Sequence, residues 1–221
     1  MLRNREEAGR LLADRLSFYR DDPSGLVLAL PRGGVVVGAV IARSLRLPLD
    51  VIIVRKLGAP GCPEYALGAV SETGSLFMNE EALAEFHLSG RELDALIASQ
   101  RSEIARQQAL YRKGRPLPSL DGRAVILVDD GIATGATFSA AAAAIKSARA
   151  GRLIAAIPVG PQDSLGRISR QVDELVVLAM PEPFHAVGQH YVDFSQVDDD
   201  EVLSALMQTA AARSEPGPGI A

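Results

Sequence analysis

Residues 125–137 read VILVDDGIATGAT, an apolar run of strand length followed by two adjacent carboxylates and a loop of glycines and threonines. The alanine-rich run 137–150 predicts a helix after the loop, and Gly151 would end it. A loop that leaves a strand and enters a helix presents unpaired backbone N–H groups at the positive end of the helix dipole. The loop is therefore suited to a phosphate, although Asp129 and Asp130 beside it would repel one.

Other apolar runs place this stretch in a larger sheet. They have the length of short strands and lie at 25–30, 50–57, 153–159 and 174–180. The run 35–47 predicts a helix between the first two strands, so the chain contains two β-α-β units. Strands that are apolar on both faces are typical of a parallel sheet covered by helices. We therefore predict an α/β fold with a doubly wound, mainly parallel five-stranded sheet and helices on both faces.

The segment between the two β-α-β units has a different character. A turn at 72–74 predicts a hairpin, and residues 88–112 predict a long polar helix that Ser89 and Glu92 would cap. The thin apolar stripe of this helix consists of Leu93, Leu96, Ile97 and Ile104. Such a stripe is typical of an arm or of a helix that contacts a partner. We expect a single domain over 1–221, with a flexible loop and helical arm insertion at 58–118, a small hood at 181–200 and a disordered tail at 214–221.

The composition excludes several classes of protein. The 23 basic residues are scattered and are outnumbered by 27 acidic residues, which argues against a nucleic-acid binder. The longest apolar segment, 33–42, has about half the length needed to cross a bilayer, and residues 1–10 show no signal-peptide pattern. Cys62 is the only cysteine, so no intramolecular disulfide can form and a reducing compartment is favoured. We expect a soluble, cytoplasmic protein without a membrane partner.

A ligand that carries hydroxyl groups near its phosphate would remove the charge conflict at 125–137. Ribose 5-phosphate has this shape: Asp129 and Asp130 would accept hydrogen bonds from its 2′- and 3′-hydroxyls, while the loop holds the 5′-phosphate. The glycines would let the backbone approach the phosphate, and Thr134 and Thr137 would add hydroxyl donors. The carboxylates could also orient waters around Mg²⁺. The glycine spacing is too short for a Walker loop, and no lysine follows.

The order of these residues resembles the phosphoribosyl pyrophosphate (PRPP) motif of the type I phosphoribosyltransferases. The matching residues are Val125, Ile126, Leu127, Val128, Asp129, Asp130, Thr134, Gly135 and Thr137. An acidic strand end followed by an ordinary turn is the alternative interpretation. The resemblance implies a set of PRPP-binding residues: Arg32, Gly33, Gly34, Arg55, Lys56, Asp129, Asp130, Gly131, Ala133, Thr134, Gly135, Ala136 and Thr137. It also implies that Asp129, Asp130 and Lys56 are catalytic.

Two further segments resemble parts of the same family. The turn PRGG at 31–34 resembles the pyrophosphate loop and would lie at the same sheet edge as the acidic pair, with a plain tight turn as the alternative. Arg55 and Lys56, at the end of the predicted strand 50–57, would neutralise the departing pyrophosphate; a solvated basic pair is the alternative. The resemblance also implies a mobile catalytic loop within 58–80 that would exclude water.

The segment 181–202 resembles the hood that covers the acceptor base in this family. The resemblance implies hood or base contacts by Phe184, Val187 and Tyr191, with Phe184 able to stack on a base. Core packing of the two aromatic residues is the alternative. Some family members place a carboxylate on Mg²⁺ near the position of Asp193. The expected cofactor is therefore Mg²⁺, held through water by Asp129, Asp130 and Asp193.

The resemblance implies a Mg²⁺-dependent phosphoribosyltransferase of nucleotide metabolism, which transfers the phosphoribosyl group of PRPP to a nitrogenous base and releases pyrophosphate. Hypoxanthine–guanine members carry an aspartate immediately before the Thr-Gly, where this chain has Ala133, so the acceptor base stays open. A PRPP- or nucleotide-binding regulator without turnover is the second hypothesis. A receiver-like domain fits less well, because its acidic residues come from separate strands. PRPP and the base are the expected partners, and a homodimer through the helix at 79–112 is a further hypothesis.

Overall fold

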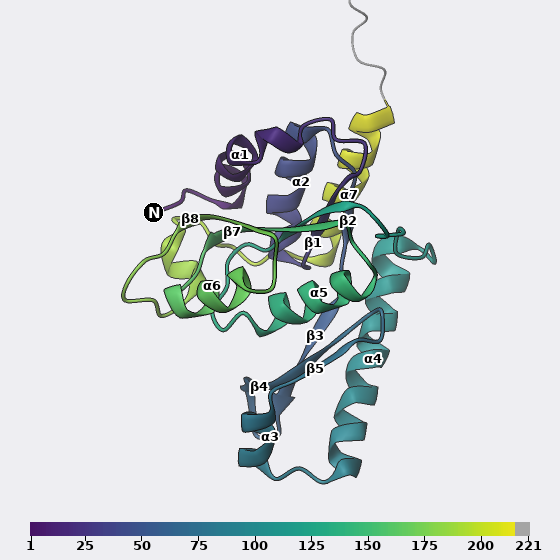
Figure 1. The fold of residues 1–221 in the computed structure, drawn as a ribbon, viewed down its shortest axis with the longest axis vertical. Coiled ribbons are helices and arrows are strands. Elements are labelled where there is room, and N and C mark those ends of the chain that lie inside the picture. Colours follow the sequence, from purple (N-terminus) through teal and green to yellow (C-terminus); the bar gives the residue numbers. More distant parts are fainter. Residues whose placement is uncertain (215–221) are drawn as a thin grey trace, which may run out of the picture.

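A sheet of five parallel strands forms the centre of the computed structural model, which describes residues 1–214 (Figure 1). The strands are β1 (Gly25–Ala29), β2 (Leu49–Val51), β6 (Ala124–Val128), β7 (Arg152–Val159) and β8 (Glu174–Ala179). Their order across the sheet is β2-β1-β6-β7-β8. Every residue of β1 and β6 is buried, as their continuous apolar sequence requires. The predicted α/β fold with a five-stranded parallel sheet is confirmed.

Helices cover both faces of this sheet, and each face has its own apolar core. One face carries α1 (Arg5–Arg15), α2 (Gly33–Leu45) and α7 (Asp199–Ser214), and the other carries α5 (Ala136–Ser147) and α6 (Gln162–Ser169). Alternate residues of β6 divide between the two cores. Ile126 and Val128 pack with the cluster that contains α1 and α2, whereas Val125 and Leu127 pack with the cluster that contains α5.

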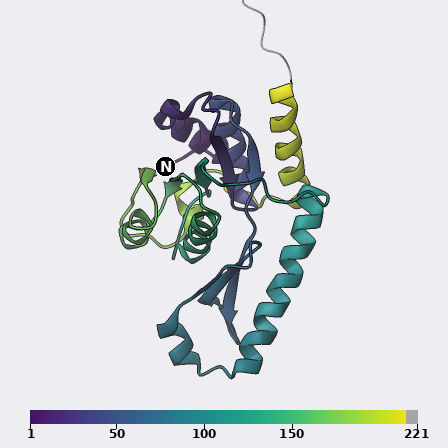
Figure 2. The same cartoon turned by 45° about the vertical axis from the view of Figure 1, so that its right-hand side comes forward.

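Residues 54–112 form an arm that projects from the parallel sheet (Figure 2). It contains an antiparallel sheet of β3 (Val54–Ala59), β4 (Cys62–Ser71) and β5 (Leu76–Met78), followed by the helices α3 (Glu80–Phe86) and α4 (Gly90–Arg112). The predicted hairpin turn and the Ser89–Glu92 capping box are both present. Leu96 and Ile97 of α4 pack inside the chain, so the apolar stripe of this helix is used within the arm. The homodimer stays a hypothesis, but the apolar stripe of α4 does not support it, because the stripe is covered within the chain.

The chain changes sheets within the run that we predicted as one strand. Residues 49–51 pair with β1 in the parallel sheet, whereas residues 54–59 pair with β4 in the arm. The prediction of a single strand over 50–57 is therefore wrong. Most of the segment 58–80, where we expected a mobile loop, belongs to the antiparallel sheet. Cys62 is exposed and pairs with Ala59 at the end of the hairpin farthest from the parallel sheet.

A buried charged network joins the arm to the parallel sheet. Arg112, at the end of α4, forms ion pairs with Glu72 and with Asp50, whose Oδ1 lies 3.0 Å from Arg112 Nε. Its Nη2 also donates to the Val51 carbonyl oxygen of β2 at 2.6 Å. The side chains of Arg112 and Glu72 are each 2% exposed. Because a buried charge is costly unless it is paired, this network fixes where the arm leaves the sheet.

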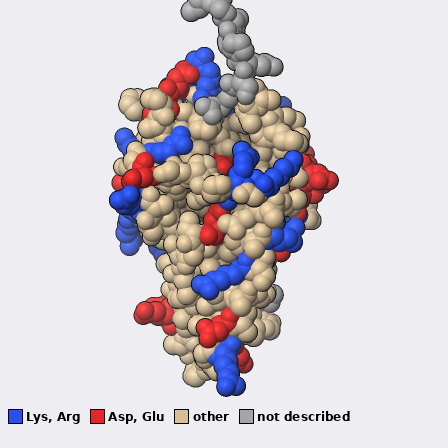
Figure 3. Space-filling model, turned by 90° about the vertical axis from the view of Figure 1, so that its right-hand side faces the viewer, with Lys and Arg blue, Asp and Glu red and all other residues tan. Residues whose placement is uncertain are grey.

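The remaining segments complete the body around the sheet. Short 3₁₀ helices lie at Ser17–Tyr19 and Val187–His190, and the hood between β8 and α7 is otherwise irregular. The tail that we predicted as disordered lies outside the described residues except for Ser214. Charged side chains are interspersed with uncharged surface on the face in Figure 3. Among the described residues, no helix has the length and apolar character needed to cross a membrane.

Candidate active site

Two loops meet at the carboxyl edge of the parallel sheet, where ligands of doubly wound folds bind. One is the PRGG turn at 31–34 between β1 and α2, and the other follows β6 at 129–135. A Cβ added at Gly33 would overlap the Asp130 carboxylate, so glycine at this position leaves room for that carboxylate beside the turn. Arg32 is exposed beside them at the start of α2. The structure therefore brings the predicted pyrophosphate loop against the acidic pair.

The two carboxylates of the acidic pair lie in different environments. Asp129 Oδ1 accepts a hydrogen bond from the Asp130 backbone N–H at 2.9 Å. Burial, and then the charge of Asp130, raise the pKa of Asp129 well above its usual range. Asp130 instead lies beside a cation, because Arg5 Nε donates to its Oδ2 at 2.7 Å. The first carboxyl is thus biased toward its protonated form, and the second is held by an ion pair.

The loop after the acidic pair lines a cavity of about 270 Å³. Its lining comprises residues 131–138 together with Lys56 and Asp129. Gly135 adopts a φ of 74° as the loop enters α5, a conformation that favours glycine. Since the first turn of α5 lines the cavity, helix N–H groups and the positive end of the helix dipole are available to a bound phosphate.

Helix α6 supports this loop from behind. Ser164 Oγ donates to the Ala133 carbonyl oxygen at 2.7 Å, and Arg167 Nη2 donates to the Thr134 carbonyl oxygen at 3.2 Å. These bonds fix two carbonyl groups of the loop. The loop is thereby shaped before any ligand binds, which lowers the ordering cost of binding. Sequence reasoning missed both residues, because no motif marks them.

Strand β3 delivers only one member of the predicted basic pair to the cavity. Arg55 and Lys56 are neighbours inside the strand, so their side chains point to opposite faces. Lys56 lines the cavity with Asp129. Arg55 points to α4, where its Nε donates to Gln100 Oε1 at 3.2 Å. Our placement of both residues at a strand end is wrong, and Arg55 does not reach the candidate site in this structure.

Two hood residues contact the acidic loop directly. Tyr191 is 5% exposed, and its hydroxyl donates to the Asp130 carbonyl oxygen at 2.6 Å. Val187 packs so closely on Gly131 that a Cβ at Gly131 would overlap it. The hood is therefore in contact with the motif. The burial of Tyr191 matches the core-packing alternative, and base contacts by Val187 and Tyr191 stay predictions.

The other two hood predictions fare differently. The ring of Phe184 stacks on His190, with centroids 5.0 Å apart, and packs against an apolar cluster that includes Tyr191. This contact matches the core-packing alternative. Asp193 Oδ1 accepts a hydrogen bond from the Ser195 backbone N–H at 3.1 Å, and Asp193 does not line the cavity beside the loop. The role of Asp193 as a metal ligand stays a prediction, and the location of its side chain does not support it.

The acidic pair suits a metal ion that arrives with a phosphorylated ligand. Among the side chains that the structure describes, no group of three or more His, Cys, Asp or Glu residues could hold a metal ion. Mg²⁺ commonly binds through one or two carboxylates together with substrate phosphates and water. Asp129 and Asp130 provide carboxylate oxygens of this kind at the edge of the sheet. These residues therefore fit a Mg²⁺–phosphate complex and do not form a site made of protein ligands alone.

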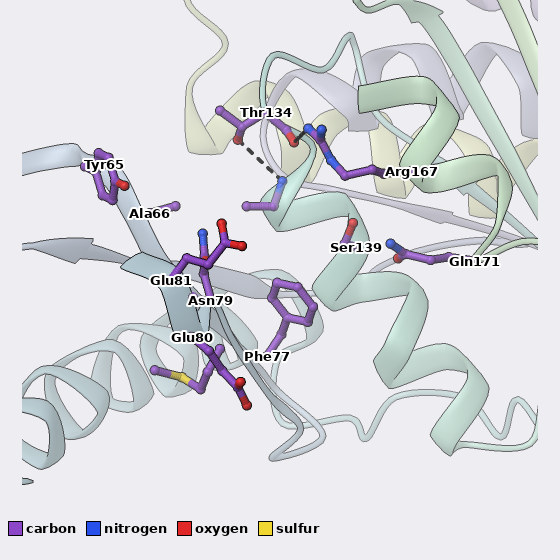
Figure 4. A pocket seen from close by; sticks show the side chains of 13 residues that line it. Tyr65, Ala66, Phe77, Asn79, Glu80, Glu81, Thr134, Ser139, Arg167 and Gln171 are labelled. Carbon is purple, nitrogen blue, oxygen red and sulfur yellow. Dashed lines mark hydrogen bonds between the residues drawn. The ribbon is translucent and has the colours of Figure 1, made fainter. Parts of the chain in front are cut away.

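A second cavity, of about 680 Å³, adjoins the first, because Thr134 and Ala136 line both. Figure 4 shows Phe77 and Glu81 of the arm region on one wall and Ser139 of α5 on the opposite wall. The space therefore lies between the arm and the body of the protein. Sequence reasoning did not anticipate it, because its walls come from segments far apart in the chain.

The acidic pair and the glycine-containing loop lie together at the carboxyl edge of a doubly wound α/β sheet, where ligands of this class of fold bind. The phosphoribosyl transferase domain family matches residues 3–188, and the chain belongs to this family. The recognition made from the motif is thus confirmed.

Relatives and a solved structure agree with this assignment. A protein of Mycobacterium tuberculosis (strain H37Rv), provisionally named phosphoribosyl transferase Rv0571c, is 42% identical over 214 residues, which are 97% of this chain and 48% of that protein. A protein of strain CDC 1551, with the provisional name phosphoribosyl transferase MT0597, matches to the same extent. The chain thus spans about half the length of these curated relatives. The crystal structure of TT1426 from Thermus thermophilus superposes with a TM-score of 0.79 and 41% identity, covering 94% of this chain and 98% of that chain.

Proposed function

We propose that the protein transfers the 5-phosphoribosyl group of PRPP to a nitrogenous base and releases pyrophosphate, with Mg²⁺ as the cofactor. The observation that carries this proposal is the 270 Å³ cavity, where Lys56, Asp129 and the loop 131–137 meet. Hydrogen-bond donors suited to a phosphate, one carboxylate and one cation line the same cavity. This arrangement complements a sugar that carries a 5′-phosphate, vicinal hydroxyls and a pyrophosphate.

The residues divide the chemistry among them. The loop 131–137 binds the 5′-phosphate through backbone N–H groups and the hydroxyls of its threonines, while the acidic pair accepts hydrogen bonds from the ribose hydroxyls. The acceptor nitrogen then attacks C1, the bond from C1 to the pyrophosphate oxygen breaks with its electron pair on that oxygen, and the nitrogen releases its proton. Lys56 places positive charge near the departing pyrophosphate. Bound Mg²⁺ would supply further positive charge to the pyrophosphate.

Positioning accounts for the rest of the proposed catalysis. A ligand held at its phosphate and its hydroxyls has C1 fixed relative to the acceptor, which makes the reaction effectively unimolecular. Ala133 lines the cavity and offers no group that could accept the proton of the base. This observation favours a second candidate, a PRPP-binding regulator without turnover.

A panel of nucleobases, each incubated with protein, PRPP and Mg²⁺, tests the proposal through pyrophosphate release. We expect release with at least one base, and its loss when Asp129→Asn and Asp130→Asn are combined. Asp94→Asn, on the exposed surface of α4, is the matched control and should leave the rate unchanged. Calorimetric PRPP binding with no release for any base would replace the transferase with the regulator, and absence of binding would refute both.

A further inference from the structure

Arg5 is a buried arginine at the first position of α1, where no motif marks it. A cation in the first turn opposes the helix dipole, so the helix itself does not favour arginine there. The side chain of Arg5 is 10% exposed and that of its partner Asp130 is 15% exposed. A buried ion pair contributes little net stability, because the cost of desolvating both charges offsets their attraction. The position of Arg5 therefore needs another explanation.

The Arg5 guanidinium joins the acidic pair to the hood. Its Nε donates to Asp130 Oδ2 at 2.7 Å, and its Nη1 donates to the Ser195 carbonyl oxygen at 2.8 Å. Its central carbon lies 3.8 Å from the centroid of the Phe194 ring, a cation–π contact. A planar guanidinium makes these contacts through two nitrogens in a fixed fork and through its flat face, an arrangement that a single ammonium nitrogen does not reproduce.

The backbone around Arg5 makes the same connection. Leu2 N–H donates to the His190 carbonyl oxygen at 2.8 Å, and Val192 N–H donates back to the Leu2 carbonyl oxygen at 2.8 Å. Asp193 N–H donates to the Arg3 carbonyl oxygen at 2.9 Å. The N-terminal segment and hood residues 190–195 therefore run together. Arg5 is the side chain through which this paired segment reaches the Asp130 carboxylate.

We propose that Arg5 is a positioning residue of the ligand site: it fixes the Asp130 carboxylate and fastens hood residues 190–195 beside it. The proposal rests on the proposed function in that the ligand is PRPP. Arg5 acts through Asp130 and does not itself touch the sugar. Its removal releases the carboxylate that we expect to bind a ribose hydroxyl, and it loosens the hood.

The test compares Arg5→Met with Arg10→Met, an exposed arginine on the same helix. Calorimetry at a temperature where every variant is folded should show PRPP–Mg²⁺ binding at least tenfold weaker for Arg5→Met and unchanged for Arg10→Met. Arg5→Lys should also bind at least fivefold more weakly, because a single ammonium nitrogen cannot occupy both the Nε and the Nη1 positions that bond Asp130 and Ser195. If Arg5→Met does not fold, Arg5→Lys carries the test. Binding by either variant as tight as in the wild type would overturn the proposal.

A double-mutant cycle shows whether Arg5 acts through Asp130. The combination of Arg5→Met with Asp130→Asn should weaken PRPP binding by clearly less than the sum of the two single losses, because the part of the effect that passes through Asp130 is lost only once. Additive losses would overturn the positioning role, because a merely structural contribution of Arg5 would add to the loss of the carboxylate.

Hydrogen–deuterium exchange without ligand separates this proposal from the proposed function. Amides of residues 190–195 should exchange at least tenfold faster in Arg5→Met than in Arg10→Met. If the wild-type protein binds no PRPP, the proposed function fails, and this exchange still tests the attachment of the hood. Equal exchange in the two variants would overturn the attachment.

Discussion

The parallel sheet and the arm differ in how evenly they are buried. Every residue of β1 and β6 is buried, so the sheet derives its stability from apolar area removed from water. In the arm, four of the 23 residues of α4 are buried, and β5 has no buried residue. The arm is attached to the body by buried apolar residues of β3 and β4, such as Leu57, Leu67 and Val70, together with the ion pairs of Arg112. Hydrophobic burial thus holds the sheet throughout, whereas the arm combines a small apolar contact with a charged network.

The largest expected effect is on the core of the sheet. Phe138→Ala in α5, where the side chain is 1% exposed, should lower the free energy of unfolding by about 4 kcal/mol, because it leaves a cavity under the sheet. Urea denaturation measures this loss. Phe18→Ala, at a side chain that is 86% exposed, is the matched control and should change stability by less than about 0.5 kcal/mol. Equal losses would contradict the assignment of the core.

Breaking the charged network should affect the arm more than the sheet. Arg112→Met leaves the buried Glu72 carboxylate without its cation, and we expect a loss of about 3 kcal/mol. Hydrogen–deuterium exchange should rise in residues 54–112 and stay unchanged in β6. The added substitution Glu72→Gln should restore part of the loss, whereas the exposed Arg101→Met on the same helix should have no effect. A uniform rise in exchange would show that the arm and the sheet unfold as one unit.

The two neighbouring cations of β3 should differ in their effect on the ligand. Lys56→Met removes a charge from the cavity and should weaken PRPP binding about tenfold, or about 1.4 kcal/mol. Arg55→Met should leave binding unchanged, because its side chain points to α4. Calorimetric titration of both variants measures the difference. A larger effect at Arg55 would mean that the face of β3 that carries Arg55, and not the face that carries Lys56, is directed to the ligand.

The smallest expected effect is a gain in stability at the acidic pair. Burial raises the pKa of Asp129, so the folded state holds that proton more tightly than the unfolded state, and the free energy of unfolding falls as pH rises toward the folded pKa. Asp129→Asn removes this penalty and keeps an oxygen for the Asp130 N–H. It should stabilise the protein by about 1 kcal/mol at pH 8 and by less at pH 5 in urea denaturation. The exposed Asp163→Asn should show no such difference, and a loss of stability at pH 8 would contradict the assigned burial.

The sequence predicted the sheet well because its physical signals are local. Continuous apolar runs located the parallel strands, and the motif at 125–137 placed the acidic pair and the loop at one edge. The run 50–57 was wrongly predicted as one strand. Ile52 and Ile53, which connect the two sheets, are fully buried, so the apolar sequence continues past the point where the chain leaves the parallel sheet. The helix α7 was not predicted, because no strong apolar stripe follows its acidic first turn.

Site residues could be predicted from the sequence only where they belong to a contiguous motif. Asp129, Asp130 and Thr134 follow from one contiguous stretch, whereas Arg5 lies 125 residues away from its partner. The direction of Lys56 follows from the pairing of β3 with β4, which apolar patterning does not specify. One local signal did exist for Arg5, namely a basic residue in a helix turn that favours acidic ones. Such a conflict between local preference and sequence marks positions that tertiary contacts determine.

Cys62 gives the hairpin of the arm its own attachment point for a spectroscopic reporter. It is the one cysteine of the chain, it is exposed, and it lies at the end of the hairpin opposite the Val54–Ser71 pair beside the parallel sheet. A thiol-reactive fluorophore or spin label would therefore attach at a single position, without prior removal of other cysteines. Fluorescence anisotropy or electron paramagnetic resonance could then follow the hairpin of the native chain in real time.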